Sequence, residues 1–172
     1  GGTEVYFARV SAGGVMQGPE VRVTFDVSAS KYPFPAWTGS EFGVSWYDYP
    51  DANAEIHFAR ISAAGVKIGS DITITSATSV SADPSLNWTG SEFGVSWEDQ
   101  RDGNNEIYFA RISADGAKIG SDLRITSDAA GSSTTSLIWT GSEFGVSWMD
   151  SRDGNAEIYF ARVSASGVKV GS

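Results

Sequence analysis

The sequence predicts an all-β fold made of repeated four-stranded units, and three observations lead to that prediction. The ten-residue block Trp-Thr-Gly-Ser-Glu-Phe-Gly-Val-Ser-Trp occurs unchanged at 37–46, 88–97 and 139–148, so the repeat is 51 residues long. Each unit contains four short stretches rich in β-branched and aromatic residues, separated by glycine-containing turns. No segment places apolar residues at helical spacing over three turns. Repeats of this length with four strands each are typical of the blades of a β-propeller.

We place the strands on the unit at 88–138 and its borders. The third strand is apolar on both faces over most of its length, which indicates a strand covered on both sides by neighbouring blades. Ile107 and Tyr108 point to opposite faces of this strand, so both are expected to be buried. A two-sheet sandwich is the competing fold, but it does not require every fourth strand to be equivalent. The strands are expected at 85–88, 92–97, 106–112 and 122–126, with the tryptophan-bearing first strand nearest the propeller axis.

The chain is expected to form a single propeller segment over 1–172. Both ends fall within repeat units, so we expect thirteen strands and an incomplete blade at each end. Closed propellers have roughly four to eight blades, so this chain does not close a ring alone. We favour a longer protein, of which this chain is a part, over several copies that associate into a ring. The repeat units are approximately 1–36 (partial), 37–87, 88–138 and 139–172 (partial).

Charge and composition exclude several classes of partner. The net charge of −9 disfavours binding to nucleic acid or to an anionic membrane surface. No apolar run approaches the roughly 20 residues that span a bilayer, so membrane insertion is not expected. The absence of cysteine excludes disulfides and thiolate metal ligands. No motif points to a cofactor, and we expect none.

Four segments of the unit resemble a known repeat. Trp-Thr-Gly at 88–90, Arg-Asp-Gly-Asn at 101–104, Glu-Ile-Tyr at 106–108 and Ile-Thr at 125–126 resemble the TolB-like propeller repeat of exported or surface bacterial proteins. The copy at 37–57 departs from this pattern, because it lacks the Arg-Asp-Gly-Asn hairpin. The resemblance implies a propeller that binds other macromolecules, usually proteins, in the periplasm, at the cell surface or outside the cell. It implies no shared catalytic residue.

Two polar hairpins supply candidate binding residues. The run Asp-Gln-Arg-Asp-Gly-Asn at 99–104 recurs as Asp-Ser-Arg-Asp-Gly-Asn at 150–155. Asp99, Asp102 and Asn104 could offer oxygen ligands to Ca²⁺, although their spacing is not that of an EF-hand. The simpler interpretation is a β-hairpin whose Asp-Gly pair supplies the left-handed backbone. The candidate binding residues are Asp99, Arg101, Asp102, Asn104, Asp150, Arg152, Asp153 and Asn155.

Aromatic residues supply a second set of candidates. Four aromatic residues, Tyr32, Phe34, Tyr47 and Tyr49, break the repeat and cluster in sequence near one blade's loops. We predict that Tyr47 and Tyr49 contact a partner. The repeated tryptophans could instead stack on sugar rings and give one glycan site per blade. Their regular apolar pattern favours packing in the core.

The sequence gives little support for catalysis. His57 is the only histidine, and it replaces a tyrosine within the third strand of its unit. Near-identical blades are poorly suited to an active site, which needs different residues in different roles. We therefore expect no enzyme, but a binding or scaffold module that recognises a macromolecular partner through propeller loops. A protein partner is favoured over a glycan; the alternatives are a multivalent lectin-like propeller, an architectural repeat of a surface filament, and association with further copies of itself.

Overall fold

A computed structural model describes residues 2–25, 27–49, 53–76 and 78–171, and in this part of the chain all regular structure is strand. Within the same ranges there is no helix that could span a membrane. The strands are β1 (Tyr6–Phe7), β2 (Val21–Arg22), β3 (Ser30–Trp37), β4 (Glu41–Asp48), β5 (Glu55–Ser62), β6 (Lys67–Thr73), β7 (Ser81–Trp88), β8 (Glu92–Asp99), β9 (Glu106–Ser113), β10 (Lys118–Arg124), β11 (Ser132–Trp139), β12 (Glu143–Asp150), β13 (Glu157–Ser164) and β14 (Lys169–Val170).

The strands form three four-stranded antiparallel sheets and one two-stranded sheet, as expected for propeller blades. We call β3–β6 the first blade, β7–β10 the middle blade and β11–β14 the last blade; β1 and β2 form the N-terminal pair. Two strands begin earlier than predicted, and three end at other residues: β8 at Asp99, β9 at Ser113 and β10 at Arg124. The inner strand β7 begins at Ser81 rather than at 85, and the outer strand β10 begins at Lys118 rather than at 122. The tight turn at Gly116 (φ 99°) lets the outer strand start directly after it. With the short β14, the described part of the chain contains fourteen strands, one more than expected.

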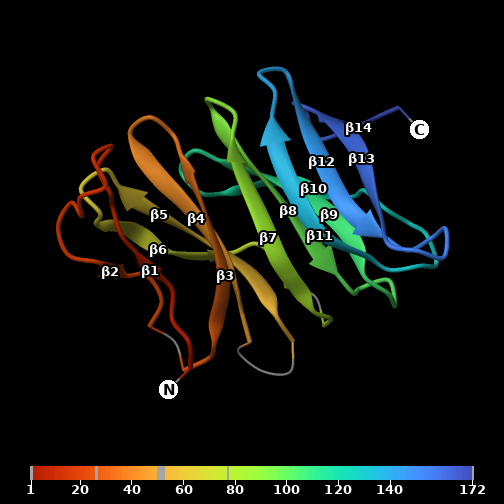
Figure 1. Ribbon diagram of the computed structural model, residues 1–172, viewed down its shortest axis with the longest axis horizontal. Coiled ribbons are helices and arrows are strands. Elements are labelled where there is room, and N and C mark those ends of the chain that lie inside the picture. Colours follow the sequence, from red (N-terminus) through yellow and green to blue (C-terminus); the bar gives the residue numbers. More distant parts are fainter. Residues whose placement is uncertain (1, 26, 50–52, 77, 172) are drawn as a thin grey trace.

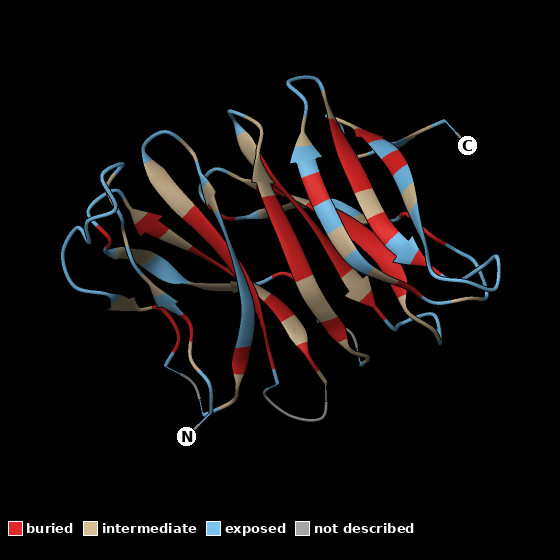
Figure 2. Cartoon of the chain, in the orientation of Figure 1, coloured by how far each residue is buried: buried red, intermediate tan, exposed pale blue. Residues whose placement is uncertain are grey.

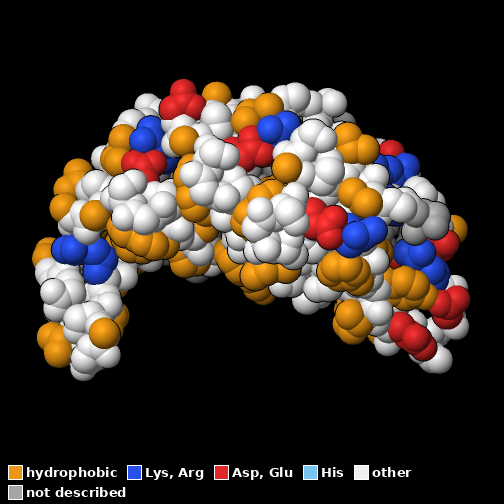
Figure 3. All heavy atoms as spheres, turned by 90° about the horizontal axis from the view of Figure 1, so that it is seen from above, with side chains coloured by type: hydrophobic (Ala, Val, Ile, Leu, Met, Phe, Trp, Pro, Cys, Tyr) orange, Lys and Arg blue, Asp and Glu red, His pale blue; other side chains and the backbone are white. Residues whose placement is uncertain are grey.

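The blades stand side by side in an arch (Figure 1). The inner strand β7 contacts both of the other inner strands, β3 and β11, and the three carry the tryptophans expected nearest the axis. Between β7 and β11, the Leu137 amide donates to Ser85 Oγ at 3.0 Å and the Trp139 amide donates to Asn87 Oδ1 at 3.2 Å. Figure 3 shows that the arch is hollow on one side, where hydrophobic side chains gather. The ring is not closed, as expected.

The hydrophobic core lies between blades rather than within one (Figure 2). One cluster joins the first and middle blades, and a second joins the middle and last blades. In β9, Ile107 is 0% exposed and Tyr108 is 6% exposed, so both faces of this strand are covered. This confirms the expectation on which the propeller prediction rested.

A phenylalanine seated over a glycine fixes the distance between blades. A Cβ atom on Gly43 would lie 2.6 Å from Phe93 Cε1 of the middle blade and 2.8 Å from Phe58 Cε2. A Cβ atom on Gly94 would lie 2.5 Å from Phe144 Cε1 of the last blade. Only glycine allows this approach. Each copy of the unchanged Glu-Phe-Gly-Val segment therefore supplies a phenylalanine that packs on the preceding blade and a glycine that receives the phenylalanine of the following blade. We call the space above this glycine the glycine notch.

Candidate functional site

The predicted hairpin residues form a network within each blade. Asp99 is fully buried, and its carboxylate accepts hydrogen bonds from Arg101 Nε (2.8 Å), Arg101 Nη2 (2.6 Å) and Trp97 Nε1 (2.8 Å). Burial alone would raise the pKa of Asp99, but the hydrogen bonds from Arg101 and Trp97 outweigh it and lower this pKa. Arg101 also pairs with Asp122 at 2.9 Å. The guanidinium is thus held by two carboxylates of its own blade.

The other hairpin residues are similarly engaged. Asp102 accepts a hydrogen bond from the Tyr108 hydroxyl, and Asn104 Nδ2 donates to the carbonyls of Asp128 (2.9 Å) and Ala130 (3.1 Å). Asp99, Asp102 and Asn104 therefore each have a different partner, and the described residues contain no group of three or more acidic, histidine or cysteine side chains that could hold a metal ion.

The last blade repeats this arrangement. Arg152 binds Asp150 through Nε (2.9 Å) and Nη2 (2.5 Å), and it lies over the ring of Tyr159 at 4.3 Å. Asp153 accepts from the Tyr159 hydroxyl, whereas Asn155 is exposed. Binding of a partner by the residues of either hairpin stays a prediction.

The aromatic candidates divide into buried and exposed rings. Tyr47 is only 6% exposed; it stacks on Tyr32 at 5.6 Å and meets Tyr49 edge-on at 5.5 Å. Tyr32 and Tyr49 are exposed.

Trp97 and Trp148 lie in the core at 0% and 5% exposure, so their rings present no face to a sugar. The tryptophans at the ends of the inner strands are more open: Trp37 is 46% exposed, and Trp88 and Trp139 are half-buried. A glycan site at these three positions stays a prediction.

An irregularity recurs in every inner strand. The register shifts between Lys31 and Phe34 in β3, and at the equivalent places in β7 and β11. At each shift one residue adopts a left-handed backbone: Tyr32 (φ 51°), Asp83 (φ 52°) and Thr134 (φ 56°). Non-glycine residues rarely adopt this conformation, and a β-branched residue such as threonine does so least readily. Backbone of this kind clusters at functional sites.

The three bulges together line one cavity of about 430 Å³. The blades differ from one another at these positions, as they also do at the hairpins around 47–54: the bulge reads Tyr-Pro-Phe at 32–34, Asp-Pro-Ser at 83–85 and Thr-Thr-Ser at 134–136. Sequence reasoning noted that Tyr32 and Phe34 break the repeat, but it did not connect them with Asp83 or Thr134, because the three bulges meet only in space. The lining residues are Tyr32, Pro33, Phe34, Asp83, Pro84, Thr134 and Thr135.

Two carboxyl groups at this cavity are desolvated. Burial raises the pKa of Asp83, and its Oδ1 atom has no hydrogen-bond partner among the described residues. Burial also raises the pKa of Glu98, with a further contribution from Asp83. Glu98 accepts hydrogen bonds from the Thr134 amide at 2.5 Å and from Asn105 Nδ2 at 3.2 Å. Burial and then Asp83 likewise raise the pKa of Tyr47. The cavity therefore combines acceptor oxygens with aromatic faces.

Comparison with known proteins identifies the fold but no family. No protein-family model matches the chain, and no curated protein does. Similar solved structures include a GH43 endo-arabinanase from Bacillus licheniformis, at 12% identity and a TM-score of 0.56 over 93% of this chain and 64% of that one. An exo-1,5-α-L-arabinanase from a bovine ruminal metagenomic library matches at 13% identity and a TM-score of 0.53 over 94% and 64% of the two chains.

Two further structures are also similar. A subtype N10 neuraminidase-like protein of A/little yellow-shouldered bat/Guatemala matches at 12% identity and a TM-score of 0.55 over 86% of this chain and 44% of that one. A structure from Agrobacterium tumefaciens assigned as a TolB reaches a TM-score of only 0.49, at 14% identity over 95% and 58%. The chain spans less than two thirds of the length of each of these structures. The propeller fold is thereby shown, whereas the TolB-like nature of the repeat stays a prediction.

These comparisons correct the expectation that the protein is not an enzyme. The two arabinanases are enzymes of the same fold, so that expectation is contradicted. The reasoning assumed that near-identical blades cannot supply different residues for different roles. The blades do differ at the inner-strand bulges, where Asp83 lines the cavity and Glu98 of β8 accepts a hydrogen bond from the Thr134 amide.

Proposed function

We propose that this chain is part of a β-propeller that binds a neutral glycan on the hollow side of the arch. One observation carries the proposal: the cavity of about 430 Å³ is lined only by inner-strand bulge residues, and these are positions at which the three blades diverge. The repeat keeps its packing segment Trp-Thr-Gly-Ser-Glu-Phe-Gly-Val-Ser-Trp unchanged, but it varies at these bulges, where three strands face a common space, as it also does at the hairpins. We place this activity outside the cytoplasm, at the cell surface or in the periplasm.

The chemistry of the lining favours a sugar. Tyr32 and Phe34 offer aromatic faces, on which the C–H faces of a sugar ring stack. Asp83 lines the cavity with a carboxyl group, which can accept a hydrogen bond from a sugar hydroxyl. An anionic ligand would be repelled by Asp83 and Glu98 and by the net charge of −9.

Size and shape favour a glycan over the protein partner that the sequence suggested. Small-ligand sites have volumes of roughly 300–1,000 Å³, a range that includes this cavity. A stable protein interface usually covers about 800 Å² on each partner, and it is centred on aromatic anchors that are exposed in the free protein. Of the two tyrosines expected in such a contact, Tyr47 is buried and Tyr49 is 37% exposed.

Titration with neutral oligosaccharides tests the proposal. A panel of arabino-, xylo- and gluco-oligosaccharides is titrated by calorimetry against the chain and against Tyr32→Asn, because asparagine tolerates the left-handed backbone at this position. We expect saturable binding of at least one sugar and a loss of about tenfold or more in affinity, since one stacked ring contributes about 0.5–1.5 kcal/mol beyond its buried area. Release of reducing ends in the same samples shows whether the bound glycan is cleaved.

Tyr6→Asn is the matched control, because Tyr6 is also exposed but lies in β1, outside the cavity lining. This variant should bind as the parent chain does. The proposal fails if no sugar of the panel binds, or if Tyr6→Asn and Tyr32→Asn weaken binding equally.

A further inference from the structure

The first and middle blades enclose a cavity of about 450 Å³ between the turns at one end of both blades. We call it the inter-blade cavity. The first blade lines it with the turn between β3 and β4 and with Arg60 of β5. The middle blade lines it with Trp88 at the end of β7 and with the turn between β9 and β10. Its volume is in the range of small-ligand sites, and it shares no lining residue with the cavity at the bulges.

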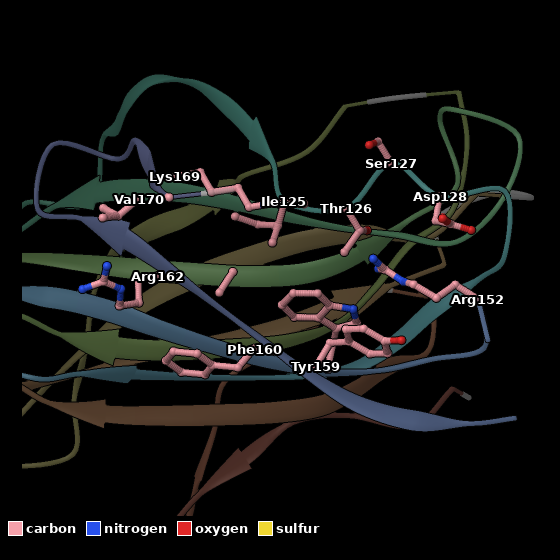
Figure 4. A pocket seen from close by; sticks show the side chains of 13 residues that line it. Ile125, Thr126, Ser127, Asp128, Arg152, Tyr159, Phe160, Arg162, Lys169 and Val170 are labelled. Atoms are coloured by element: carbon pink, nitrogen blue, oxygen red, sulfur yellow. Dashed lines mark hydrogen bonds between the residues drawn. The ribbon is translucent and has the colours of Figure 1, made fainter.

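The cavity beside β13 of the last blade has a different origin. Figure 4 shows it between residues 125–128 and the side chains of Tyr159 and Phe160, and its volume is about 530 Å³. In the middle blade, the residues that follow β10 take the equivalent place, where the Ile125 amide donates to the Ile107 carbonyl at 2.8 Å. We therefore assign no ligand to the cavity beside β13. The inter-blade cavity, in contrast, lies between two blades of four described strands each.

Trp88 gives the inter-blade cavity a rigid aromatic wall. Its ring packs against Phe93 at a centroid distance of 4.6 Å, yet the residue is only half-buried and lines the cavity. The C–H face of a sugar ring stacks on an aromatic ring of this kind. Because the packing against Phe93 already restricts the indole, little side-chain entropy is lost on binding.

An arginine and a glutamate present donors and acceptors side by side in this cavity. Glu41 accepts hydrogen bonds from Arg60 Nε at 2.6 Å and from Arg60 Nη2 at 2.9 Å, so the two side chains fix each other. Arg60 Nη1 reaches the Asp115 carbonyl only at 3.5 Å, which is long for a hydrogen bond, and it keeps donor capacity for a ligand. A hydroxyl group both donates and accepts, so two neighbouring sugar hydroxyls match a guanidinium beside a carboxylate.

Asp115 adds an acceptor from the middle blade. The residue is exposed, and its carboxylate accepts a hydrogen bond from the Ser113 hydroxyl, which lowers the pKa of Asp115. This carboxylate is therefore ionised at neutral pH and held in place. Two carboxylates and one guanidinium give the lining of the cavity a net negative charge, which disfavours an anionic ligand.

We propose that the inter-blade cavity is a second binding site, which takes one ring of a neutral sugar with neighbouring hydroxyl groups. The sugar ring stacks on Trp88, and its hydroxyls bind Arg60 Nη1 and the carboxylate of Asp115. Because the two cavities share no lining residue, this site is independent of the function proposed above.

The next interface repeats this arrangement except for the aspartate. Arg111 of the middle blade binds Glu92 at 2.6 Å and 2.7 Å, and it reaches the Ser166 carbonyl of the last blade at 3.3 Å. Trp139 is half-buried, as Trp88 is. Since Ser166 stands where Asp115 stands one repeat earlier, we expect weaker sugar binding at this interface.

Fluorine NMR of the chain labelled with fluorotryptophan tests the proposal, because each tryptophan gives its own resonance. The Trp88 resonance is assigned by its loss in Trp88→Phe. The same arabino-, xylo- and gluco-oligosaccharides are titrated, and at least one should shift the Trp88 resonance saturably. Asp115→Ser introduces the residue that the next copy carries, and it should weaken this binding about threefold or more, because one hydrogen bond to a charged group is lost.

Ser166→Asp is the matched control, since it makes the reverse change at the next interface and should leave the Trp88 titration unchanged. Tyr32→Asn, at the cavity at the bulges, should also leave it unchanged. The proposal is overturned if no sugar shifts the Trp88 resonance saturably, or if Asp115→Ser binds as the parent chain does. Binding that Tyr32→Asn abolishes, without any shift at Trp88, would support the cavity at the bulges and overturn the inter-blade site.

Discussion

The middle and last blades have almost the same sequence in their third strands but opposite environments. Ile107 and Phe109 of β9 are 0% and 1% exposed, whereas the equivalent Ile158 and Phe160 of β13 are 77% and 62% exposed. The two strands share the sequence Glu-Ile-Tyr-Phe-Ala-Arg. Burial in this fold is therefore a property of the neighbouring blade rather than of the residue itself.

Polar contacts show the same difference. Arg111 of the middle blade binds Glu92 through Nε (2.6 Å) and Nη2 (2.7 Å) and also reaches the Ser166 carbonyl of the last blade at 3.3 Å. Arg162, the equivalent residue in the last blade, meets Glu143 through Nη1 alone at 3.3 Å. Arg111, which a hairpin of the next blade contacts, therefore forms a two-point ion pair. Arg162, which has no such hairpin beside it among the described residues, forms a single and longer contact.

The largest expected difference between the two blades comes from truncating the phenylalanine of the third strand. Phe109→Ala should lower the free energy of unfolding by about 3–5 kcal/mol, because it empties a filled core site. Phe160→Ala should lower it by less than about 1 kcal/mol, because the ring is mostly exposed. Urea denaturation followed by tryptophan fluorescence measures both. Equal losses would mean that the last blade is covered in solution.

The glycine notch should give the next largest difference. Gly94→Ala places a methyl group 2.5 Å from Phe144 Cε1, and the overpacking should lower the free energy of unfolding by about 1–3 kcal/mol. Gly145→Ala meets only Phe160 and Ile138, whose exposed side chains can turn away, so its effect should stay within about 0.5 kcal/mol. Thermal unfolding of the two variants compares them directly. A similar loss of stability in both would show that the notch of the last blade is already filled.

These comparisons indicate what sequence reasoning reaches in this protein. Alternation of apolar and polar residues predicted the strands, and the third strand, apolar on both faces, predicted the burial of Ile107 and Tyr108. Both succeeded because every copy of the repeat carries the residues that pack against a similar neighbouring blade. The inner-strand bulge was not predicted. Its left-handed position is occupied by residues such as Asp83 rather than by glycine, the residue that usually indicates this conformation in a sequence. The site lies at the bulges of three different strands, so only their meeting in space creates it.

Substitutions at the inner-strand bulges should change the free energy of unfolding by about 1 kcal/mol or less. Thr134→Asn in the last blade replaces a β-branched residue in the left-handed region by one that tolerates this conformation, and it keeps the backbone amide that donates to Glu98. The free energy of unfolding should therefore rise by about 1 kcal/mol. Asp83→Asn in the middle blade exchanges two residue types that both tolerate this conformation, and the backbone should contribute almost no change. Chemical denaturation at pH 7 tests the pair. If Thr134→Asn destabilises the chain, the threonine side chain makes a contact that offsets its strain.

The middle and last blades should differ least in the stability that they gain from their buried aspartates, Asp99 and Asp150. Hydrogen bonds from Arg101 and Trp97, against the effect of burial, lower the pKa of Asp99. Hydrogen bonds from Arg152 hold the pKa of Asp150 well below its ordinary value. A carboxyl group with a lowered pKa in the folded state stabilises the fold above its unfolded pKa of about 3.9, and this contribution is lost as the pH falls below that value.

All of these donors belong to the same blade as the aspartate, so an open neighbouring face should not weaken them. Asp99→Asn and Asp150→Asn should therefore destabilise the chain by similar amounts at pH 7, and both deficits should shrink by pH 3. Urea midpoints measured across this range provide the comparison. A much smaller deficit for Asp150→Asn would mean that even this local network depends on a covering blade, and that cooperation between blades extends to the polar hairpins.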